Sequence, residues 1–555
     1  MSKITTKNLF LFIILICLSC NALAKSSLPP YNIIFIIIDQ ETHQLLNANN
    51  YELPARKALK AHGISFENHY AGAAMCSPSR ATLLTGVPPQ INHVFDQMEY
   101  AFVPELEPSR PNMGSVLKSL GYRTAYFGKF EMNKKLLINV KNTVNYSTLA
   151  KAYGFDVFNS DGDVGGQPKQ GYEEDIYFSG EAIRWLRENV GKTSQPFFLV
   201  ISLLNPHDIM YGDANIAGLP KVQQSAAHAI FPPPNNSIYK KNWEFSLPIS
   251  LNESLKKSGM PNALWEYREG WSGALGHIPT ERKDMWQYYY NYYLNALRDN
   301  DRSLQNIVDA LNDMHLWENT IVILTADHGE MGGAHGGLRG KGPMAYEENA
   351  HIPLIVAHPK APRGVQSHIL TSHLDLLPTF IGLTGLSHNM KKEVLKGHDF
   401  SEFILHPENQ NIHAIRKGIL FNYVGISTID NRYLSKMLIA SFTHQSLPSL
   451  TEINLNKRGF LAFVFDGRYK FARFYSPCDF NTPTTLEEIF EKNDVQLFDL
   501  QNDPTETHNM ALDKNKNKEL ILRMNELLNN LIAEEVGVND GSFLPAEIRV
   551  AINRV

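Results

Sequence analysis

A short segment that begins at a cysteine carries the clearest chemical signal in the chain. It runs Cys76-Ser77-Pro78-Ser79-Arg80 and continues to Thr85-Gly86. Pro78 suits the first turn of a helix and Gly86 suits its end, so the spacing predicts a helix that begins at Cys76. Backbone N–H groups at such a helix start favour a bound anion, and Arg80 in the first turn fits best if an anion lies beside it. A cysteine in this place could act as a redox or acyl-transfer nucleophile.

Polar side chains also follow four apolar runs, each at the point where the run ends. Asp39-Gln40 follows residues 33–38, Gly128-Lys129 follows 123–127, Asn205-Pro206-His207 follows 197–204, and Asp327-His328 follows 321–326. Any one of these groups could simply start a loop, because Asp, Asn and Gly are common there. In open α/β sheets, however, ligands bind at the carboxyl ends of the strands. We therefore expect the four groups to converge on one crevice.

The elements that must position these residues follow an α/β order. Residues 33–38 form an apolar, β-branched run without alternation, which indicates a strand buried on both faces of a parallel sheet. Helices are expected between the strands, at 180–188 and 287–314. The order predicts an α/β fold in which helices sandwich a mostly parallel central sheet.

The pattern changes from about residue 440. Residues 461–465, the turn Asp466-Gly467 and residues 468–471 predict a hairpin. A further strand is expected at 495–500 and an amphipathic helix at 518–533. We therefore predict an N-terminal catalytic domain over residues 25–440 and a C-terminal subdomain, an antiparallel sheet plus helix, over residues 441–555.

The charge balance excludes one class of partner. The 555 residues include 52 Lys plus Arg and 57 Asp plus Glu, for a net charge of −5. A nucleic-acid binder would usually show a basic excess, so no nucleic-acid partner is expected.

The first 24 residues are typical of a secretory signal peptide. Lys3 and Lys7 precede an apolar run at 9–18, which is too short to span a bilayer, and Ala22-Leu23-Ala24 suits cleavage after Ala24. We expect an exported, periplasmic or secreted product with no transmembrane segment in the mature chain. Anchoring as a lipoprotein through Cys20 is the weaker alternative. Cleavage would leave two cysteines, Cys76 and Cys478, and a disulfide between them is one interpretation.

The segment around Cys76 resembles the sulfatase family. The family signature, Cys-x-Pro-Ser-Arg followed after four residues by Thr-Gly, is complete here. The resemblance implies an alkaline-phosphatase-like fold. It also implies that a formylglycine-generating maturation enzyme oxidises Cys76 to formylglycine, an aldehyde that hydrates to a geminal diol. Cys76 would then hold no disulfide, and Cys478 would be free.

The resemblance extends to the polar residues at the strand ends. It implies a metal site made of Asp39, Gln40, Asp327, His328 and residue 76, and catalytic roles for Cys76, Arg80, Lys129, His207 and Lys341. The Asp-Gln and Asp-His pairs are similar to those of the choline sulfatase and phosphonate monoester hydrolase branch. The stretch from Leu497 to Asn509 resembles the closing segment of the family.

The chemistry that this resemblance implies is coherent. Two carboxylates, an amide oxygen and an imidazole suit one divalent cation, most simply Ca²⁺, with Mn²⁺ and Mg²⁺ as alternatives. The ion would hold a sulfate oxygen and lower the pKa of the diol hydroxyl that attacks sulfur. Arg80, Lys129 and Lys341 would neutralise the sulfate. His207 would protonate the leaving alcohol oxygen or orient the ester, and the second hydroxyl would then lose its proton and expel sulfate.

Residues 329–342 are rich in glycine but do not form a nucleotide phosphate loop. His335 stands where the first glycine of that pattern belongs, and Gly342 replaces its Ser or Thr. A flexible loop that delivers Lys341 is the better interpretation. We take His335, His351 and His373 as structural. The irregular segments 140–175 and 208–285 are expected to shape the substrate pocket.

One position departs from the family pattern. Two residues after its motif lysine the family usually has a histidine that contacts the formylglycine, and here that residue is Glu131. Three functions therefore stay open. The first is a sulfatase acting on a sulfated carbohydrate or small organic sulfate, the second a phosphonate monoester or phosphodiester hydrolase, and the third a catalytically silent binder of sulfated glycans.

Overall fold

A computed structural model describes residues 30–44, 48–137, 146–257, 259–386 and 394–552. The predicted signal peptide, residues 1–24, lies outside these residues. The described strands form a large central sheet, a two-stranded parallel sheet and a four-stranded antiparallel sheet. No helix within the described ranges is both long and apolar enough to cross a membrane.

The central sheet has eight strands in the order β5-β4-β6-β1-β7-β8-β2-β9. Their bounds are β1 (Asn32–Ile38), β2 (Ile64–Phe66), β4 (Arg123–Gly128), β5 (Val157–Phe158), β6 (Phe197–Leu203), β7 (Thr320–Ala326), β8 (Leu354–Ala357) and β9 (Val365–Ser367). The five strands from β5 to β7 are parallel, whereas β8 runs antiparallel to both of its neighbours. The expectation of a mostly parallel sheet is confirmed.

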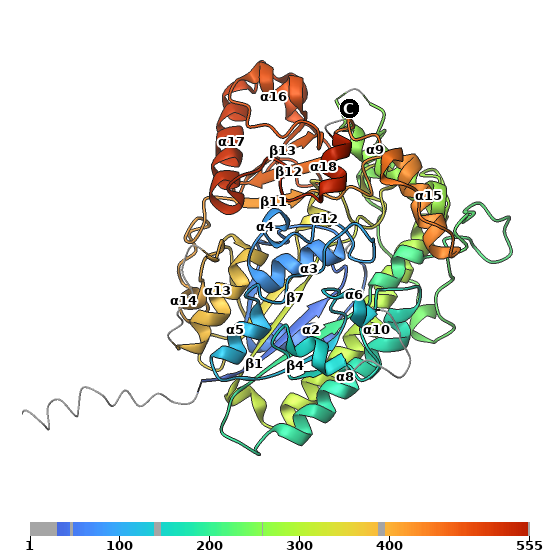
Figure 1. Ribbon diagram of the computed structural model, residues 1–555. Coiled ribbons are helices and arrows are strands. Elements are labelled where there is room, and N and C mark those ends of the chain that lie inside the picture. The colour runs from blue at the N-terminus through green and yellow to red at the C-terminus, as the bar shows by residue number, and fades with distance from the viewer. Residues whose placement is uncertain (1–29, 45–47, 138–145, 258, 387–393, 553–555) are drawn as a thin grey trace, which may run out of the picture.

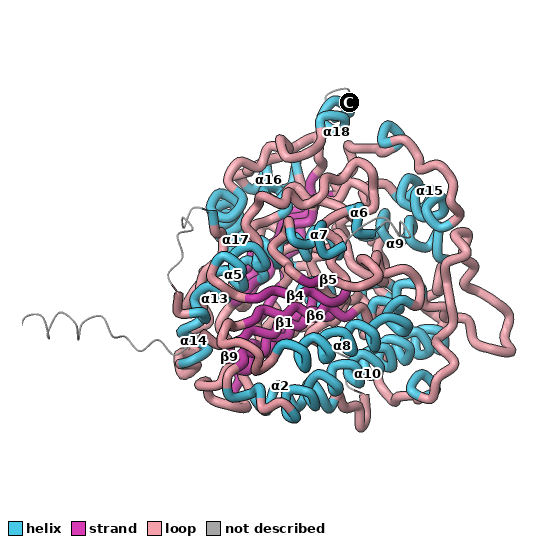
Figure 2. The backbone as a smooth tube through the Cα atoms, turned by 60° about the horizontal axis from the view of Figure 1, so that its bottom comes forward, coloured by secondary structure: helices cyan, strands magenta, loops and turns pink. Residues whose placement is uncertain are grey.

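Helices cover both faces of this sheet (Figures 1 and 2). Ile34, Ile36 and Ile38 of β1 pack in one core with α2 (Pro54–His62), α8 (Gln170–Asn189) and α10 (Lys283–Asp313). The alternate residues, Ile33, Phe35 and Ile37, belong to the core on the other face, which includes side chains of α3 (Cys76–Thr85), α5 (Met113–Ser119) and α13 (His373–Thr384). Burial of both faces explains why the strand sequences are apolar without alternation.

The four-stranded sheet has the order β11-β12-β13-β14 and is antiparallel throughout. Its strands are β11 (Ile419–Tyr423), β12 (Phe460–Phe465), β13 (Tyr469–Tyr475) and β14 (Asp494–Asp499), with α16 (Leu486–Lys492) and α17 (Lys518–Leu531) beside them (Figure 1). The hairpin predicted around Asp466-Gly467 joins β12 to β13. Strand β11 comes before residue 440, and the division of the chain at that residue stays a prediction.

The remaining α-helices and strands are short, apart from two helices. They are β3 (His69–Tyr70), α4 (Pro89–Asn92), α6 (Lys134–Leu137), α7 (Tyr146–Lys151), α9 (Asn262–Leu275), α11 (Ala334–Gly337), α12 (Glu347–Ala350), β10 (Thr371–Ser372), α14 (Ser401–Leu405), α15 (Asn431–Phe442) and α18 (Ala546–Ile552). Helix α8 begins ten residues before the predicted 180, and α9 lies in a segment expected to be irregular.

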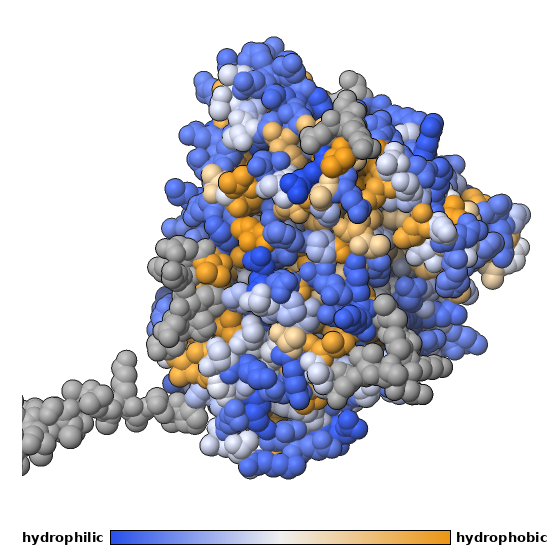
Figure 3. All heavy atoms as spheres, viewed as in Figure 1, coloured by the Kyte–Doolittle hydropathy of each residue, from blue (hydrophilic) through white to orange (hydrophobic). Residues whose placement is uncertain are grey.

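The face shown in Figure 3 is largely hydrophilic, with separate apolar patches.

Candidate active site

Four adjacent strands bring the predicted site residues together. The order β4-β6-β1-β7 places the carboxyl ends of these parallel strands side by side, so the residues that follow them meet at one edge. Lys129 Nζ lies 2.7 Å from Asp39 Oδ2, although the two residues follow different strands. The convergence expected from the sequence is therefore present in the structure.

Cys76 is the first residue of α3, as the spacing predicted, and Gly86 ends the helix in the left-handed conformation. Its side chain is fully buried, with Sγ 3.3 Å from His328 Nε2 and 3.8 Å from Asp39 Oδ1. Burial, together with the charge of Asp39, raises the pKa of the thiol to about 12. Cys76 and Cys478 are both free, so the disulfide interpretation is wrong.

The side chains of Asp39, Cys76, Asp327 and His328 form a compact set of possible metal ligands. One ligand atom from each lies within 4.8 Å of all the others, and all four residues are buried. The Nδ1 atom of His328 lies 3.1 Å from the carbonyl oxygen of Gly329, so Nδ1–H donates there and the lone pair of Nε2 faces Cys76 and the carboxylates. Burial lowers the pKa of His328 to about 4, so the ring is neutral at pH 7.

Gln40 is held in place from two sides. Its amide oxygen accepts a hydrogen bond from Lys341 Nζ at 2.5 Å, and its side-chain NH₂ donates to Glu330. Its backbone has a φ of 71°, and its N–H donates to Asp327 Oδ1. The sequence analysis missed Glu330, although this acid lies only three residues after Asp327.

Glu330 also organises the glycine-rich segment. Its carboxylate accepts hydrogen bonds from the backbone N–H groups of Gly332 and Gly340. The segment is buried except at Arg339, which is half-buried, and its apolar side chains Met331, Ala334 and Leu338 are at most 1% exposed. It delivers Lys341 into the site as predicted, but as a packed and hydrogen-bonded segment rather than a flexible loop.

Arg80 neutralises carboxylates of this cluster. Its guanidinium lies 3.1 Å from Asp39 Oδ2 and 3.0 Å from Asp327 Oδ2. It also donates to the carbonyl oxygen of Lys129 and to Ser202 Oγ. The anionic partners of Arg80 in the structure are therefore side chains of the protein. Ser202 is a second site residue that the sequence analysis missed, because it lies inside the apolar run of β6.

Lys129 approaches Asp39 because Gly128 allows a close contact between two strands. A Cβ atom at Gly128 would lie 1.8 Å from the carbonyl oxygen of Ser202, and its φ of +113° also favours glycine. Burial alone would raise the pKa of Asp39, but the positive charges of Lys129 and Arg80 hold it well below its ordinary value. Asp39 is therefore ionised in the folded protein.

His207 begins the short 3-10 helix His207–Tyr211 after β6 and is 3% exposed. Burial and the positive charge of Lys341 hold its pKa well below the ordinary value, so the imidazole is neutral. Its Nδ1 atom has no hydrogen-bond partner among the described residues. Gly166 packs against this ring, since a Cβ at that position would lie 2.7 Å from His207 Cε1.

The two long irregular segments both reach the site. Gly166 comes from the first, 140–175, and Met210, whose sulfur lies 2.7 Å from Lys341 Nζ, comes from the second, 208–285. These contacts support the expectation that the segments shape the pocket.

Glu131 lies inside the cluster rather than outside it. The carboxylate is fully buried, 3.1 Å from Lys129 Nζ, and accepts a hydrogen bond from Ser77 Oγ at 3.2 Å. Burial raises its pKa to about 7. Its backbone N–H donates to Asp163 Oδ2, which fixes the turn that aims the side chain at Lys129.

Two of the remaining histidines have protein partners on both ring nitrogens. His373 contacts Ser79 Oγ and the carbonyl oxygen of Ala326, and His351 contacts Glu347 and the carbonyl oxygen of Glu67. These contacts agree with structural roles.

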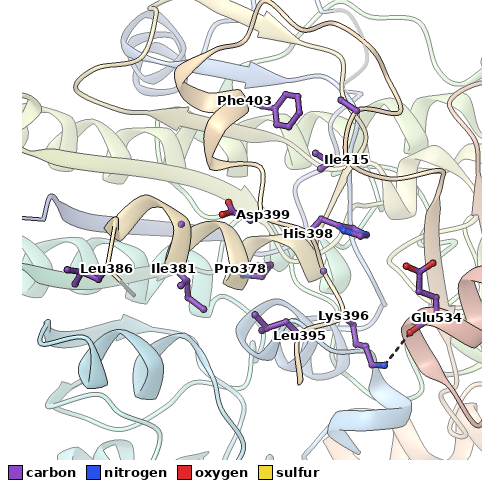
Figure 4. Close-up of a pocket in the computed structure, with 13 residues that line it drawn as sticks. Pro378, Ile381, Leu386, Leu395, Lys396, His398, Asp399, Phe403, Ile415 and Glu534 are labelled. Carbon is purple, nitrogen blue, oxygen red and sulfur yellow. Dashed lines mark hydrogen bonds between the residues drawn. The ribbon is translucent and has the colours of Figure 1, made fainter. Parts of the chain in front are cut away.

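A separate hollow of about 870 Å³ contains none of the site residues (Figure 4). It is lined by Pro378 and Ile381 of α13, and across it Lys396 Nζ donates to the carbonyl oxygen of Glu534. The side chains drawn there are mixed apolar and charged, and they include no cysteine.

Comparison with known proteins connects this geometry to one family. The family model described as Sulfatase matches residues 31–386. Arylsulfatase K of Canis lupus familiaris is 26% identical over 369 residues, covering 64% of this chain and 63% of that protein. The N-acetylglucosamine-6-O-sulfatase of Bacteroides thetaiotaomicron is 25% identical over 428 residues, covering 66% and 70%.

Solved structures share the fold across almost the whole chain. A 2-O GAG sulfatase aligns with a TM-score of 0.65 at 19% identity, covering 91% of this chain and 93% of that one. The phosphonate monoester hydrolase of Agrobacterium radiobacter aligns with a TM-score of 0.61 at 20% identity, covering 91% and 96%. The family model covers well over half of the sequence, and it includes Cys76 and both Asp pairs: the chain belongs to the sulfatase family.

Proposed function

We propose that this protein hydrolyses a sulfate ester of a carbohydrate or small organic alcohol, with a formylglycine made from Cys76 as nucleophile. The observation that carries the proposal is the position of Cys76 at the start of α3, within the set of Asp39, Asp327 and His328. The unmodified thiol is a poor candidate, because a pKa of about 12 keeps it protonated at pH 7. Conversion by a maturation enzyme removes that difficulty.

The residues present fit one divalent cation. Asp39 and Asp327 offer carboxylate oxygens, His328 offers a nitrogen whose tautomer is already fixed, and the Gln40 amide oxygen lies beside them on Lys341. This oxygen-rich set suits Ca²⁺, with Mn²⁺ and Mg²⁺ as alternatives. When bound, such an ion supplies Lewis acidity to the sulfate and to the hydroxyl of residue 76.

The cationic side chains supply the complementary charge. Lys129 and Lys341 are held by Asp39 and Gln40, so their ammonium groups are already oriented before a sulfate arrives. Arg80 keeps Asp39 and Asp327 in position through charged contacts to both. We assign His207 to the leaving alcohol oxygen, because its Nδ1 atom is free to exchange a proton or orient the ester.

Substrate entry requires the covering segments to move. Cys76, Asp39 and Lys129 are each 0% exposed. Gly166 packs against His207, and Met210 packs against Lys341. The relatives named above include an N-acetylglucosamine-6-O-sulfatase, which supports a sulfated sugar as the substrate class. Residues 1–24 support export to the periplasm or the medium as the setting in which such a substrate is met.

A phosphonate monoester or phosphodiester hydrolase is the second candidate. The pairs Asp39-Gln40 and Asp327-His328 favour it, because Gln and His at these places resemble that branch. Both reactions use an anionic tetrahedral centre, so the same cationic cluster would serve either one.

The test is a comparison of turnover for aryl sulfate, aryl phosphodiester and aryl phosphonate esters by protein from a host that matures sulfatases. The proposal expects the highest kcat/KM for the sulfate, and loss of that activity in Cys76→Ala but not in Cys478→Ala. A preference for the phosphonate would favour the second candidate. No turnover of any ester or sulfated sugar, with residue 76 matured, would contradict both.

A further inference from the structure

A second cluster of ligand-type side chains lies outside the residues around Cys76. One nitrogen of His335 and one carboxylate oxygen each of Glu348 and Glu506 lie within 4.8 Å of one another. These residues come from three separate parts of the chain: α11, α12 and the turn that follows β14. The mechanism proposed above uses none of them.

His335 is oriented as a metal ligand would be. Its ring is 0% exposed and stacks on Tyr346, with the ring centroids 3.5 Å apart and the planes 5° from parallel. Its Nδ1 atom lies 3.1 Å from Glu253 Oε2, so Nδ1–H donates to that carboxylate and the lone pair is left on Nε2. Nε2 has no hydrogen-bond partner in the described part of the chain, and it lies 3.7 Å from Glu348 Oε2.

We propose that His335 Nε2, Glu348 and Glu506 bind a divalent transition-metal cation, with Zn²⁺ as the best fit. A carboxylate that accepts Nδ1–H, a histidine and a metal form a common arrangement, and Glu253 occupies the carboxylate position here. One imidazole and two carboxylates match the three protein ligands of a Zn²⁺ site that keeps its fourth position open. The side chain of Glu348 is 27% exposed, so water has access to the fourth position.

The local charge also favours a cation. Glu347 and Glu506 share one ammonium group, since Lys470 Nζ lies 2.6 Å from Glu347 Oε1 and 2.8 Å from Glu506 Oε1. Glu253 and Glu348 add two further carboxylates, and among the described residues neither forms an ion pair with a lysine or arginine. The backbone N–H of Glu347 donates to Glu506 Oε2, which orients Glu506 before a cation binds.

A proton on the ring is the competing explanation for the same geometry. Although burial opposes the charged form, the neighbouring carboxylates of Glu253 and Glu348 raise the pKa of His335 to about 9. A protonated ring would bridge the two carboxylates and leave no lone pair for a metal. The two accounts differ in whether the full-length protein takes up a cation at this place.

A cation here would join two parts of the fold that are far apart in the sequence. His335 belongs to the packed segment that delivers Lys341, and Glu506 belongs to the segment that closes the antiparallel sheet. Binding would therefore stabilise the contact between the central and C-terminal sheets.

The test is equilibrium dialysis of the chelator-treated full-length protein against Zn²⁺ alone, with metal content measured by mass spectrometry and thermal midpoints recorded in parallel. His335→Gln and Glu348→Gln remove one ligand each, and Asp327→Asn removes a ligand at the site around Cys76. His43→Gln is the matched control, because His43 also faces a carboxylate, Glu67 at 3.6 Å, but belongs to neither cluster.

The proposal expects His335→Gln and Glu348→Gln each to bind one equivalent of Zn²⁺ less than the wild type and to lose the Zn²⁺-induced rise in thermal midpoint. Asp327→Asn should retain this equivalent, and His43→Gln should match the wild type. Unchanged Zn²⁺ content in both His335→Gln and Glu348→Gln would overturn the proposal and leave the protonated ring. Glu348→Gln keeps the test decisive if His335→Gln does not fold. Because Asp327→Asn is measured separately, a loss of metal from the site around Cys76 can be told apart from a loss of Zn²⁺ at His335.

Discussion

Cys76 Sγ lies 3.3 Å from His328 Nε2, although 252 residues separate the two in sequence. The contact joins the start of α3 to the end of β7, the two places where the nucleophile and a metal ligand were expected. The same helix start faces Asp39 across 3.8 Å. Residue 76 is therefore positioned to share a cation with the ligands around it.

The first prediction concerns the metal site. Asp327→Asn should lower kcat/KM for an aryl sulfate by at least about 10²-fold, because it weakens the carboxylate set that fits the cation. Removal of divalent ions from the wild type by a chelator should cause a similar loss, which Ca²⁺ should reverse. Asp96→Asn is the control, since Asp96 is also buried but its carboxylate is held by Ser427. Equal loss in both variants would indicate a general effect on folding.

The second prediction is that Glu131 makes the free energy of unfolding depend on pH. Burial raises its pKa from 4.5 to about 7, so the folded protein keeps this proton to higher pH than the unfolded chain does. Its contribution to the free energy of unfolding is complete below about pH 4.5 and is lost as the pH rises through about 7. The stability of the wild type relative to Glu131→Gln should therefore fall by about 1–3 kcal/mol across this range.

Urea unfolding of both proteins at the two ends of the range measures this difference. Glu67→Gln is a control of opposite sign, because a hydrogen bond with His43 lowers the pKa of Glu67. There the stability of the wild type relative to the variant should fall only as the pH decreases below 4.5, so this pair is also measured below that pH. A relative stability of Glu131→Gln that does not change with pH would contradict the assigned protonation.

Gly166 makes a prediction about the cover of the site. In Gly166→Ala the new Cβ would meet His207 Cε1 at 2.7 Å and Lys129 Nζ at 3.0 Å, so either the covering segment or His207 must shift. Displacement of His207 from its position should lower kcat/KM by about 10²-fold. Gly191→Ala is the control for backbone strain alone. Gly191 has a φ of +76°, similar to the +69° of Gly166, but a Cβ added there would have no heavy atom within 4 Å. Similar losses in the two variants would contradict the role given to Gly166.

The sequence predicted those parts of the structure that depend on burial pattern and motif spacing. β1, β4, β6 and β7 each match an apolar run to within one residue, because burial on both faces requires continuous hydrophobic sequence. Cys76 at a helix start and Gly86 at its end followed from Pro78 and the positive φ that glycine tolerates.

Long-range contacts could not be predicted in the same way. Nothing in the spacing shows that Arg80 reaches Asp39 and Asp327, or that Gln40 is held by Glu330, since these pairs form only when the sheet assembles. Helix α9 was missed because its residues carry too weak an apolar period to separate it from the irregular chain around it. His335 was taken as structural, and only its free Nε2 atom beside Glu348 and Glu506 gives it another interpretation.

The identity of residue 76 in protein from its native host tests the account most directly. Mass spectrometry of the peptide that contains residue 76 should show formylglycine, lighter than cysteine and reactive with a hydrazide. Turnover of an aryl sulfate should rise in proportion to that fraction and fall by at least about 10³-fold in Cys76→Ala. An unmodified thiol at position 76 in fully active protein, or substantial turnover by Cys76→Ala, would contradict the account.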